Sequence, residues 1–141
     1  MFRRFVWFVM GLFPIKARSL DDFIRLVREN RCAWIEAQQE SVLLGTAHSE
    51  AVGTIGQHSY LLRVRAKSSR HGRWLLFTKM LIERFGSEYG KDDAKQREED
   101  VANSILIAEE EATRLEAGLP GVEIRRFWSI VGVEENENEY Q

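Results

Sequence analysis

Residues 19–31 carry the clearest helical pattern in the chain. Apolar side chains recur there at the spacing of one helical face, at Leu20, Phe23, Ile24 and Val27. Ser19 is a favourable N-cap, and the carboxylate of Asp22 falls in the first turn, where unpaired backbone amides attract negative charge. The pattern predicts an amphipathic helix over residues 19–31.

A period of two runs through residues 60–67 and is typical of a strand. One face would hold Tyr60, Leu62, Val64 and Ala66, and the other Leu61, Arg63, Arg65 and Lys67. We expect further strands over 41–48 and over 122–133, the latter because β-branched and aromatic residues are frequent there. Residues 33–40 combine helix-forming residues with weak periodicity, so their assignment stays open.

Residues 72–86 are apolar almost all round, which favours a helix buried on most sides, and the most buried of the fold. Residues 91–117 show an apolar seam with steps of four and three, ended by Gly118 and Pro120. This second pattern predicts a long helix that packs on its own domain through Val101, Ile105, Ala108, Ala112 and Leu115.

Both ends of the chain have a distinct composition. Residues 1–15 are strongly apolar, and the uncharged stretch inside them, Phe5–Phe13, is too short for a membrane span of about 20 residues. This stretch would dock in the protein's own core or on a partner; a membrane surface and a secretory signal are the alternatives. Residues 134–141 are acidic and polar, and we expect a flexible tail.

Together the elements predict an α+β fold, because strands and helices do not alternate regularly. We expect a small, mostly antiparallel sheet of about three strands packed against three helices. A single domain would cover residues 1–133, with residues 1–18 as its apolar N-terminal segment.

The composition narrows the class of protein. The chain has 141 residues, of which 44% are hydrophobic, so a wholly disordered chain is excluded. Its single cysteine cannot form an intramolecular disulfide or a multi-cysteine zinc site, which points to a reducing compartment, and we expect a cytoplasmic protein.

The near-neutral total charge of −2 hides a strong division along the chain. Residues 1–84 contain 14 Lys and Arg against 7 Asp and Glu, a net charge of +7. Residues 85–141 contain 6 against 15, a net charge of −9. Such asymmetry raises the expectation of a polyanion site or of electrostatic assembly.

The first functional hypothesis is a non-enzymatic interaction or assembly subunit, part of a larger complex or a homo-oligomer. Apolar surface that one small chain fails to bury marks an interface, and opposite charges steer partners together. The candidate interaction residues are Phe5, Trp7, Phe8, Val101, Ile105, Ala108, Ala112 and Leu115.

The alternative hypothesis is a nucleic-acid-binding module built on a basic strand and turn. Its phosphate contacts would be Arg63, Arg65, Lys67, Arg70 and Arg73, and Tyr60 or Trp74 would stack on a base if exposed. Trp74, however, fits a buried face better, and no helix-turn-helix, RNP-like or zinc-finger signature is present. The competing interpretation is a solvated face neutralised by the acidic helix.

Enzymatic function has the weakest support. His48 and His58 would face each other if residues 42–50 and 56–66 paired around Gly53, and could then hold a metal with Glu50 or serve a phosphoesterase or nuclease. No phosphate-binding loop or catalytic signature accompanies them. We expect no cofactor and no metal, and lean against an enzyme.

Overall fold

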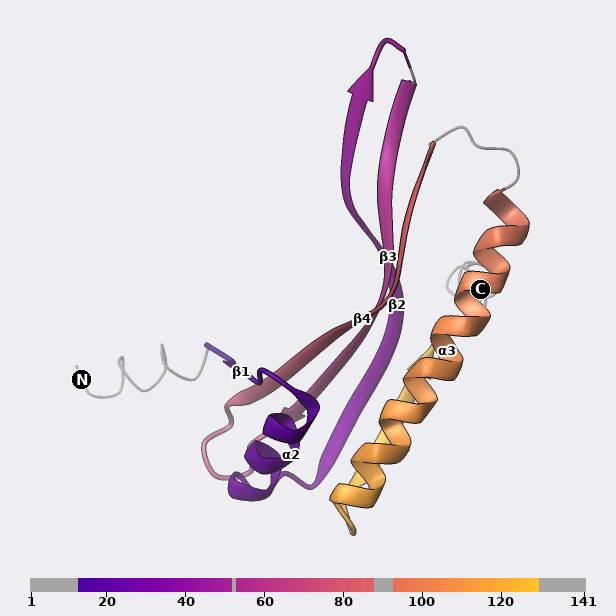
Figure 1. Ribbon diagram of the computed structural model, residues 1–141. Helices are drawn as coiled ribbons and strands as arrows, with labels where there is room; N and C mark the ends of the chain where they lie inside the picture. The colour runs from indigo at the N-terminus through magenta and orange to yellow at the C-terminus, as the bar shows by residue number, and fades with distance from the viewer. Residues whose placement is uncertain (1–12, 52, 88–92, 130–141) are drawn as a thin grey trace, which may run out of the picture. The chain divides into compact units, whose positions relative to one another are not determined.

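The computed structural model describes residues 13–51, 53–87 and 93–129. Within these residues two helices and five strands follow one another, and Figure 1 shows how they are arranged. Their order is β1 (Ile15–Lys16), α2 (Leu20–Glu29), β2 (Trp34–Ser49), β3 (Gly53–Lys67), β4 (Trp74–Ser87), α3 (Asp93–Gly118) and β5 (Glu123–Trp128).

The strands form one mixed sheet in the order β1-β4-β3-β2-β5. Short turns join β2, β3 and β4, which makes these three neighbours antiparallel. The edge strand β1 runs parallel to β4, with Ile15 opposite Leu75. The amide of Glu123 donates to the carbonyl of Ala33, and the amide of Ser129 to the side chain of Gln39, so β5 runs parallel to β2.

The fold is therefore α+β, but the expected architecture of about three strands against three helices is wrong. The main cause is residues 72–86, predicted as the most buried helix and observed as strand β4. Leu75 and Phe77 of β4 are buried, whereas Met80 and Phe85 are 45% and 62% exposed. Residues 15–16 and 34–40 add the strand pairing that the sequence pattern did not predict.

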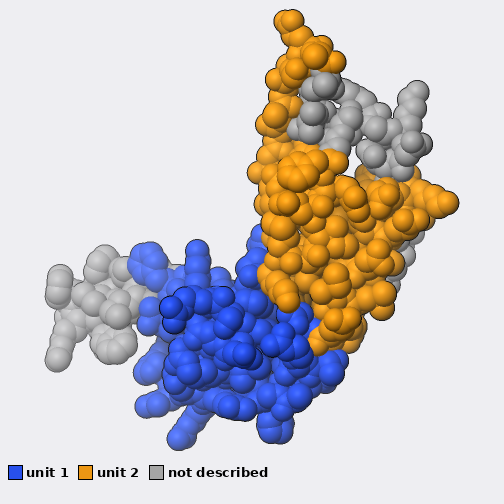
Figure 2. All heavy atoms as spheres, viewed as in Figure 1, with its two compact units in different colours: residues 1–37, 63–78, 111–127 blue, residues 38–62, 79–110, 128–141 orange. Residues whose placement is uncertain are grey.

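The chain forms two compact units, coloured separately in Figure 2. Unit 1 comprises residues 1–37, 63–78 and 111–127, and unit 2 comprises residues 38–62, 79–110 and 128–141. The boundaries fall inside β2, β3, β4, α3 and β5, so each unit takes a part of these elements. Each unit is described separately below.

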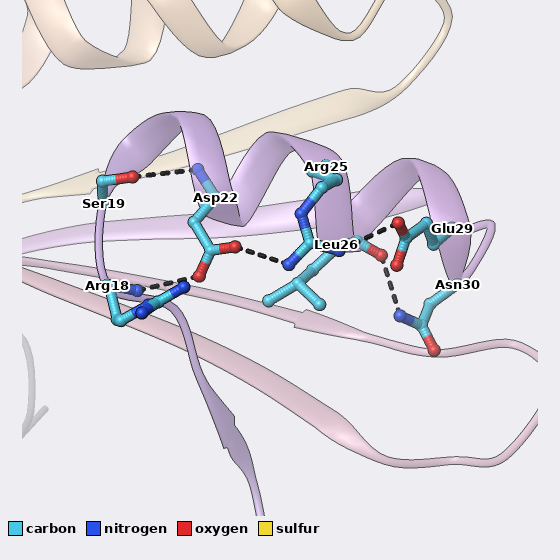
Figure 3. A network of polar contacts seen from close by, with 7 residues as sticks. All are labelled: Arg18, Ser19, Asp22, Arg25, Leu26, Glu29 and Asn30. Carbon is cyan, nitrogen blue, oxygen red and sulfur yellow. Dashed lines mark hydrogen bonds and ion pairs between the residues drawn. The ribbon is translucent and has the colours of Figure 1, made fainter.

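Helix α2 in unit 1 begins at its predicted N-cap but ends at Glu29, before the predicted residue 31. Ser19 accepts a hydrogen bond from the amide of Asp22 at 3.0 Å, as an N-cap does (Figure 3). Asp22 in turn accepts from the backbone amide of Arg18 and from the guanidinium of Arg25, and these contacts lower its pKa. At the other end the side chain of Asn30 donates to the carbonyl of Leu26.

The core of unit 1 lies between α2, the last turns of α3 and one face of the sheet. Phe23 is fully buried, with its ring 6.4 Å from that of Phe77 on β4. A Cβ added at Gly118 would lie 3.0 Å from Ile24, which shows how closely the end of α3 approaches α2. The side chain of Arg28 also donates to the carbonyl of Gly118 at 2.6 Å.

The interior of unit 2 contains several polar groups. Gln39 is fully buried and donates to the hydroxyl of Ser104 at 2.7 Å. Asp100 on α3, whose side chain is 3% exposed, receives two hydrogen bonds from Arg84 at 2.8 and 2.9 Å. Polar contacts thus attach α3 to the sheet in this unit.

Helix α3 confirms the long helix predicted over 91–117, but its buried stripe is rotated. Ala108, Ala112 and Leu115 are buried as expected, whereas Val101 and Ile105 are only half-buried. Their places are taken by polar side chains, including Asp100 and Ser104. The described part of the chain contains no helix that is both long and apolar enough to cross a membrane.

Candidate nucleic-acid interface

Strand β3 places its cations on one face of the sheet in unit 1. Arg63, Arg65 and Lys67 are exposed, whereas Val64 and Ala66 between them are buried. The alternation predicted from the sequence is confirmed over these residues, because successive side chains of a strand point to opposite faces. Three positive charges therefore lie in a row on the face opposite the helices.

Two tryptophans from the neighbouring strands lie on the same face. Trp34 of β2 and Trp74 of β4 are half-buried, and their ring centroids are 5.9 Å apart in an edge-to-face arrangement. The expectation that Trp74 belongs to a buried helical face is wrong, since β4 is a strand. Because β4 lies beside β3 in the sheet, the ring of Trp74 lies next to the basic residues of β3.

Cations lie over both indole rings. The guanidinium of Arg65 is 4.8 Å from the Trp74 ring centroid, and the ammonium of Lys67 is 5.7 Å from it. Arg125 of β5 is 4.8 Å from the centroid of Trp34. These distances fall within the range in which a cation is attracted to the negative face of an aromatic ring.

Two glutamates bind the edges of the two stacked arginines. Glu36 accepts from Arg65 at 3.0 Å, and Glu123 accepts from Arg125 at 3.0 and 3.5 Å. The hydrogen bond to Glu123 raises the pKa of Arg125 above its ordinary value, so the guanidinium remains charged. We call this surface the cation–indole face; it consists of Trp34, Glu36, Arg63, Arg65, Lys67, Trp74, Glu123 and Arg125.

The β3–β4 turn carries the remaining predicted cations. Its shape is fixed by Ser68, whose amide donates to the carbonyl of Arg73 at 2.8 Å and whose hydroxyl accepts from the amide of Arg70. Gly72 allows the turn because its φ of +66° is unfavourable for other residues. Arg70 is exposed, whereas Arg73 is half-buried and donates to the carbonyl of Phe13.

Sequence reasoning did not identify Trp34 and Arg125 as parts of this surface. Trp34 lay in the segment whose assignment stayed open, and Arg125 lay in a predicted strand whose neighbours were unknown. The alternation of Glu123, Arg125 and Phe127 along β5 was the available signal, since all three are exposed. Tyr60, the other proposed stacking residue, is 3% exposed, and burial raises the pKa of its phenol.

The other candidate residues lie elsewhere. Ala108, Ala112 and Leu115 are covered by the protein's own chain. Phe5, Trp7, Phe8 and the tail at 134–141 lie outside the described residues, as does the end of the strand predicted to residue 133.

The metal hypothesis for His48 and His58 assumed a hairpin centred on Gly53. Strand β2 ends at Ser49 and β3 begins at Gly53, so the turn is centred before Gly53. In residues 13–51, 53–87 and 93–129, no group of three or more His, Cys, Asp and Glu side chains is placed to hold a metal ion.

Cys32 is buried next to the end of α2, and burial raises the pKa of its thiol. A raised pKa keeps the thiol protonated and therefore less reactive.

Comparison of the chain with protein-family models, with curated proteins and with solved structures finds no match.

Proposed function

We propose that this protein is a non-enzymatic binding module whose cation–indole face binds nucleic acid. The observation that carries the proposal is the placement of three cations over two half-buried tryptophans, on an exposed sheet face. Positive charge supplies the sequence-independent part of nucleic-acid affinity, by releasing the counterions of the phosphates. Aromatic and guanidinium planes supply surfaces on which bases stack.

Charge supports the same assignment. The cation–indole face holds four cations against two carboxylates, and Arg70 extends the positive region along the adjacent turn. More widely, the described residues of unit 1 contain 13 Lys and Arg against 7 Asp and Glu, a net charge of +6. A polyanion approaching this unit therefore meets an attractive field.

The test is fluorescence anisotropy with labelled single- and double-stranded oligonucleotides at several salt concentrations. We expect an affinity that falls with salt, and Arg63→Ala and Lys67→Ala to reduce the slope of log K against log salt by about 0.7 to 1 each. Arg25→Gln is the matched control, because it removes one positive charge from α2 in the same unit. Absence of salt-dependent binding to both oligonucleotides would contradict the proposal.

A second proposal, an assembly subunit that binds a protein partner or another copy, is supported by apolar surface in unit 2. Leu43 and Leu44 of β2 are 56% and 48% exposed, and Met80 and Phe85 of β4 are also exposed. Sedimentation velocity over a range of concentrations tests self-association, which Leu43→Asp should weaken. A wild-type protein that stays monomeric and retains no partner in a pull-down would count against this second proposal.

A cytoplasmic location belongs to both proposals. It is supported by the single cysteine, which has no partner for an intramolecular disulfide.

A further inference from the structure

We infer that the nucleic acid bound by the cation–indole face is single-stranded, and that its bases stack on two arginine–tryptophan pairs, Arg65 with Trp74 and Arg125 with Trp34. The inference rests on the proposed function and specifies its ligand. The cations then have different roles: Arg65 and Arg125 stack on bases, while Lys67 and Arg70 contact phosphates.

Each stacked arginine has one planar face available. A guanidinium that lies over an indole ring is covered by the ring on one side only. The side chains of Arg65 and Arg125 are 53% and 44% exposed, which agrees with this arrangement. Arginine planes and aromatic rings are the groups on which proteins stack unpaired bases.

The two glutamates determine which surface of each arginine is left for a ligand. Glu36 and Glu123 bind N–H groups at the guanidinium edges, where a phosphate would otherwise bind through two hydrogen bonds. These carboxylates compete with a phosphate for one nitrogen of Arg65 and two of Arg125, whereas the planar faces of the guanidinium groups have no such competitor. The same carboxylates limit rotation of the guanidinium planes, so less rotamer entropy is lost when a base stacks.

Lys67 and Arg70 are suited to the phosphates. An ammonium group has no planar face and acts on a phosphate as a point charge. Arg70 is exposed on a turn whose backbone is fixed by Ser68. A strand of nucleic acid that places its bases over the two arginines can therefore place its backbone along β3 and this turn.

A duplex does not fit this surface, because its bases are stacked on each other and paired inside the helix. The two indole centroids are 5.9 Å apart, well above the rise of about 3.4 Å between stacked bases of one strand. The two ring planes are also inclined at 69°, so bases that lie parallel to them are not stacked on each other as in a duplex.

The experiment uses Arg→Lys substitutions, which keep the charge and remove the plane. Binding of a labelled single strand and of the duplex of the same sequence is measured by anisotropy for wild type and for Arg65→Lys/Arg125→Lys. We expect wild type to prefer the single strand by about tenfold or more, and the double variant to lose roughly five- to tenfold per site in single-strand affinity. The salt slope should not change.

Arg126→Lys is the matched control, because Arg126 lies on the same strand but binds Glu116 at 2.7 Å. Thermal melts of all variants confirm that they are folded. Equal or tighter binding of the duplex would overturn the inference, and so would unchanged affinity in the double variant, even though both results leave the proposed function standing. Failure of wild type to bind either nucleic acid would instead refute the proposed function and the inference with it.

Discussion

Unit 1 and unit 2 share strands and a helix but differ in charge and in the nature of their interiors. The described residues of unit 1 have a net charge of +6, whereas those of unit 2 contain 4 Lys and Arg against 9 Asp and Glu, a net charge of −5. Charge therefore follows the units as well as the two halves of the sequence. The difference in net charge favours unit 1 over unit 2 as the part that would bind an anionic ligand.

The buried side chains of the two units also differ in polarity. Around α2 the buried side chains are apolar, with Phe23, Ile35 and Leu75 among the largest. In unit 2, Gln39, Ser59, Asp100 and Ser104 are buried, and Ser59 has no hydrogen-bond partner in the described structure. Unit 1 thus buries mainly apolar side chains, whereas unit 2 buries these polar groups beside apolar residues such as Leu62.

The largest effect is expected in the apolar interior of unit 1. Phe23→Ala should reduce the free energy of unfolding by about 3–5 kcal/mol, because it removes a fully buried ring and leaves a cavity beside Phe77. Urea unfolding followed by circular dichroism measures the change. Leu106→Ala, at a residue 63% exposed, is the control and should alter the free energy by less than about 0.5 kcal/mol. Similar changes in the free energy of unfolding for the two variants would contradict the assignment of Phe23 to the core of unit 1.

In the polar interior of unit 2, a substitution that removes a buried charge should lower the free energy of unfolding. Asp100→Asn loses ionic hydrogen bonds from Arg84, and we expect a loss of about 1.5–3 kcal/mol in the free energy of unfolding. Arg84 is about half exposed and regains water, which keeps the loss below that for a fully buried pair. Urea unfolding of Asp100→Asn at neutral pH tests this, and an unchanged midpoint would contradict it.

The pH dependence of stability sharpens the same contrast. The guanidinium of Arg84 lowers the pKa of Asp100 below its ordinary value of 3.8, so folding favours the ionised form. The stability that this group contributes is complete above that value and is lost as the pH falls through the lower pKa of the folded state.

The stability difference between wild type and Asp100→Asn should therefore narrow as the pH is lowered from about 5 to about 2. Urea midpoints across that range measure it, and Asp22→Asn in unit 1 should show a change in the same direction, since contacts with Arg18 and Arg25 also lower the pKa of Asp22. A constant difference for Asp100→Asn over this range would mean that the Arg84 contact does not stabilise the folded protein.

The smallest effect on stability is expected on the cation–indole face. Arg65→Lys keeps the charge beside Glu36, and exposed ion pairs contribute about 1 kcal/mol or less, so thermal melting should hardly change. Binding of a single strand should weaken in the same variant. A large drop in melting temperature would show that the stacked arginine is structural, and the binding data for that variant would no longer support a role in stacking.

The sequence predicted α2, α3 and the alternation in β3 because each depends on local pattern. Ser19 at the start of α2 and Gly118 at the end of α3 are signals that need no knowledge of the fold. Strand β4 was misassigned because an almost wholly apolar run has no clear period, and residues 72–86 exceed the usual length of a strand and suit a helix. In β2 the buried Gln39 interrupts the apolar side of the alternation, and it hid the first half of that strand.

The candidate site was predictable only in the part that one strand supplies. Arg63, Arg65 and Lys67 follow from the alternation within β3. Trp34 and Arg125 join them because the sheet order places β4, β3, β2 and β5 side by side, and that order brings together residues far apart in sequence. The buried face of α3 was likewise not predictable from local pattern, because Arg84 and Gln39 determine which polar residues of the helix are buried.

The most direct test of the central claim is an NMR titration of the ¹⁵N-labelled protein with a short single-stranded oligonucleotide. Trp34 and Trp74 have indole N–H signals on the cation–indole face, whereas the indole of Trp128 in unit 2 donates to Glu109 at 2.7 Å and serves as an internal reference. We predict that the signals of Trp34 and Trp74 shift on titration while that of Trp128 stays in place. Shifts at Trp128 and along α3, with Trp34 and Trp74 unchanged, would contradict the assignment of nucleic-acid binding to this face.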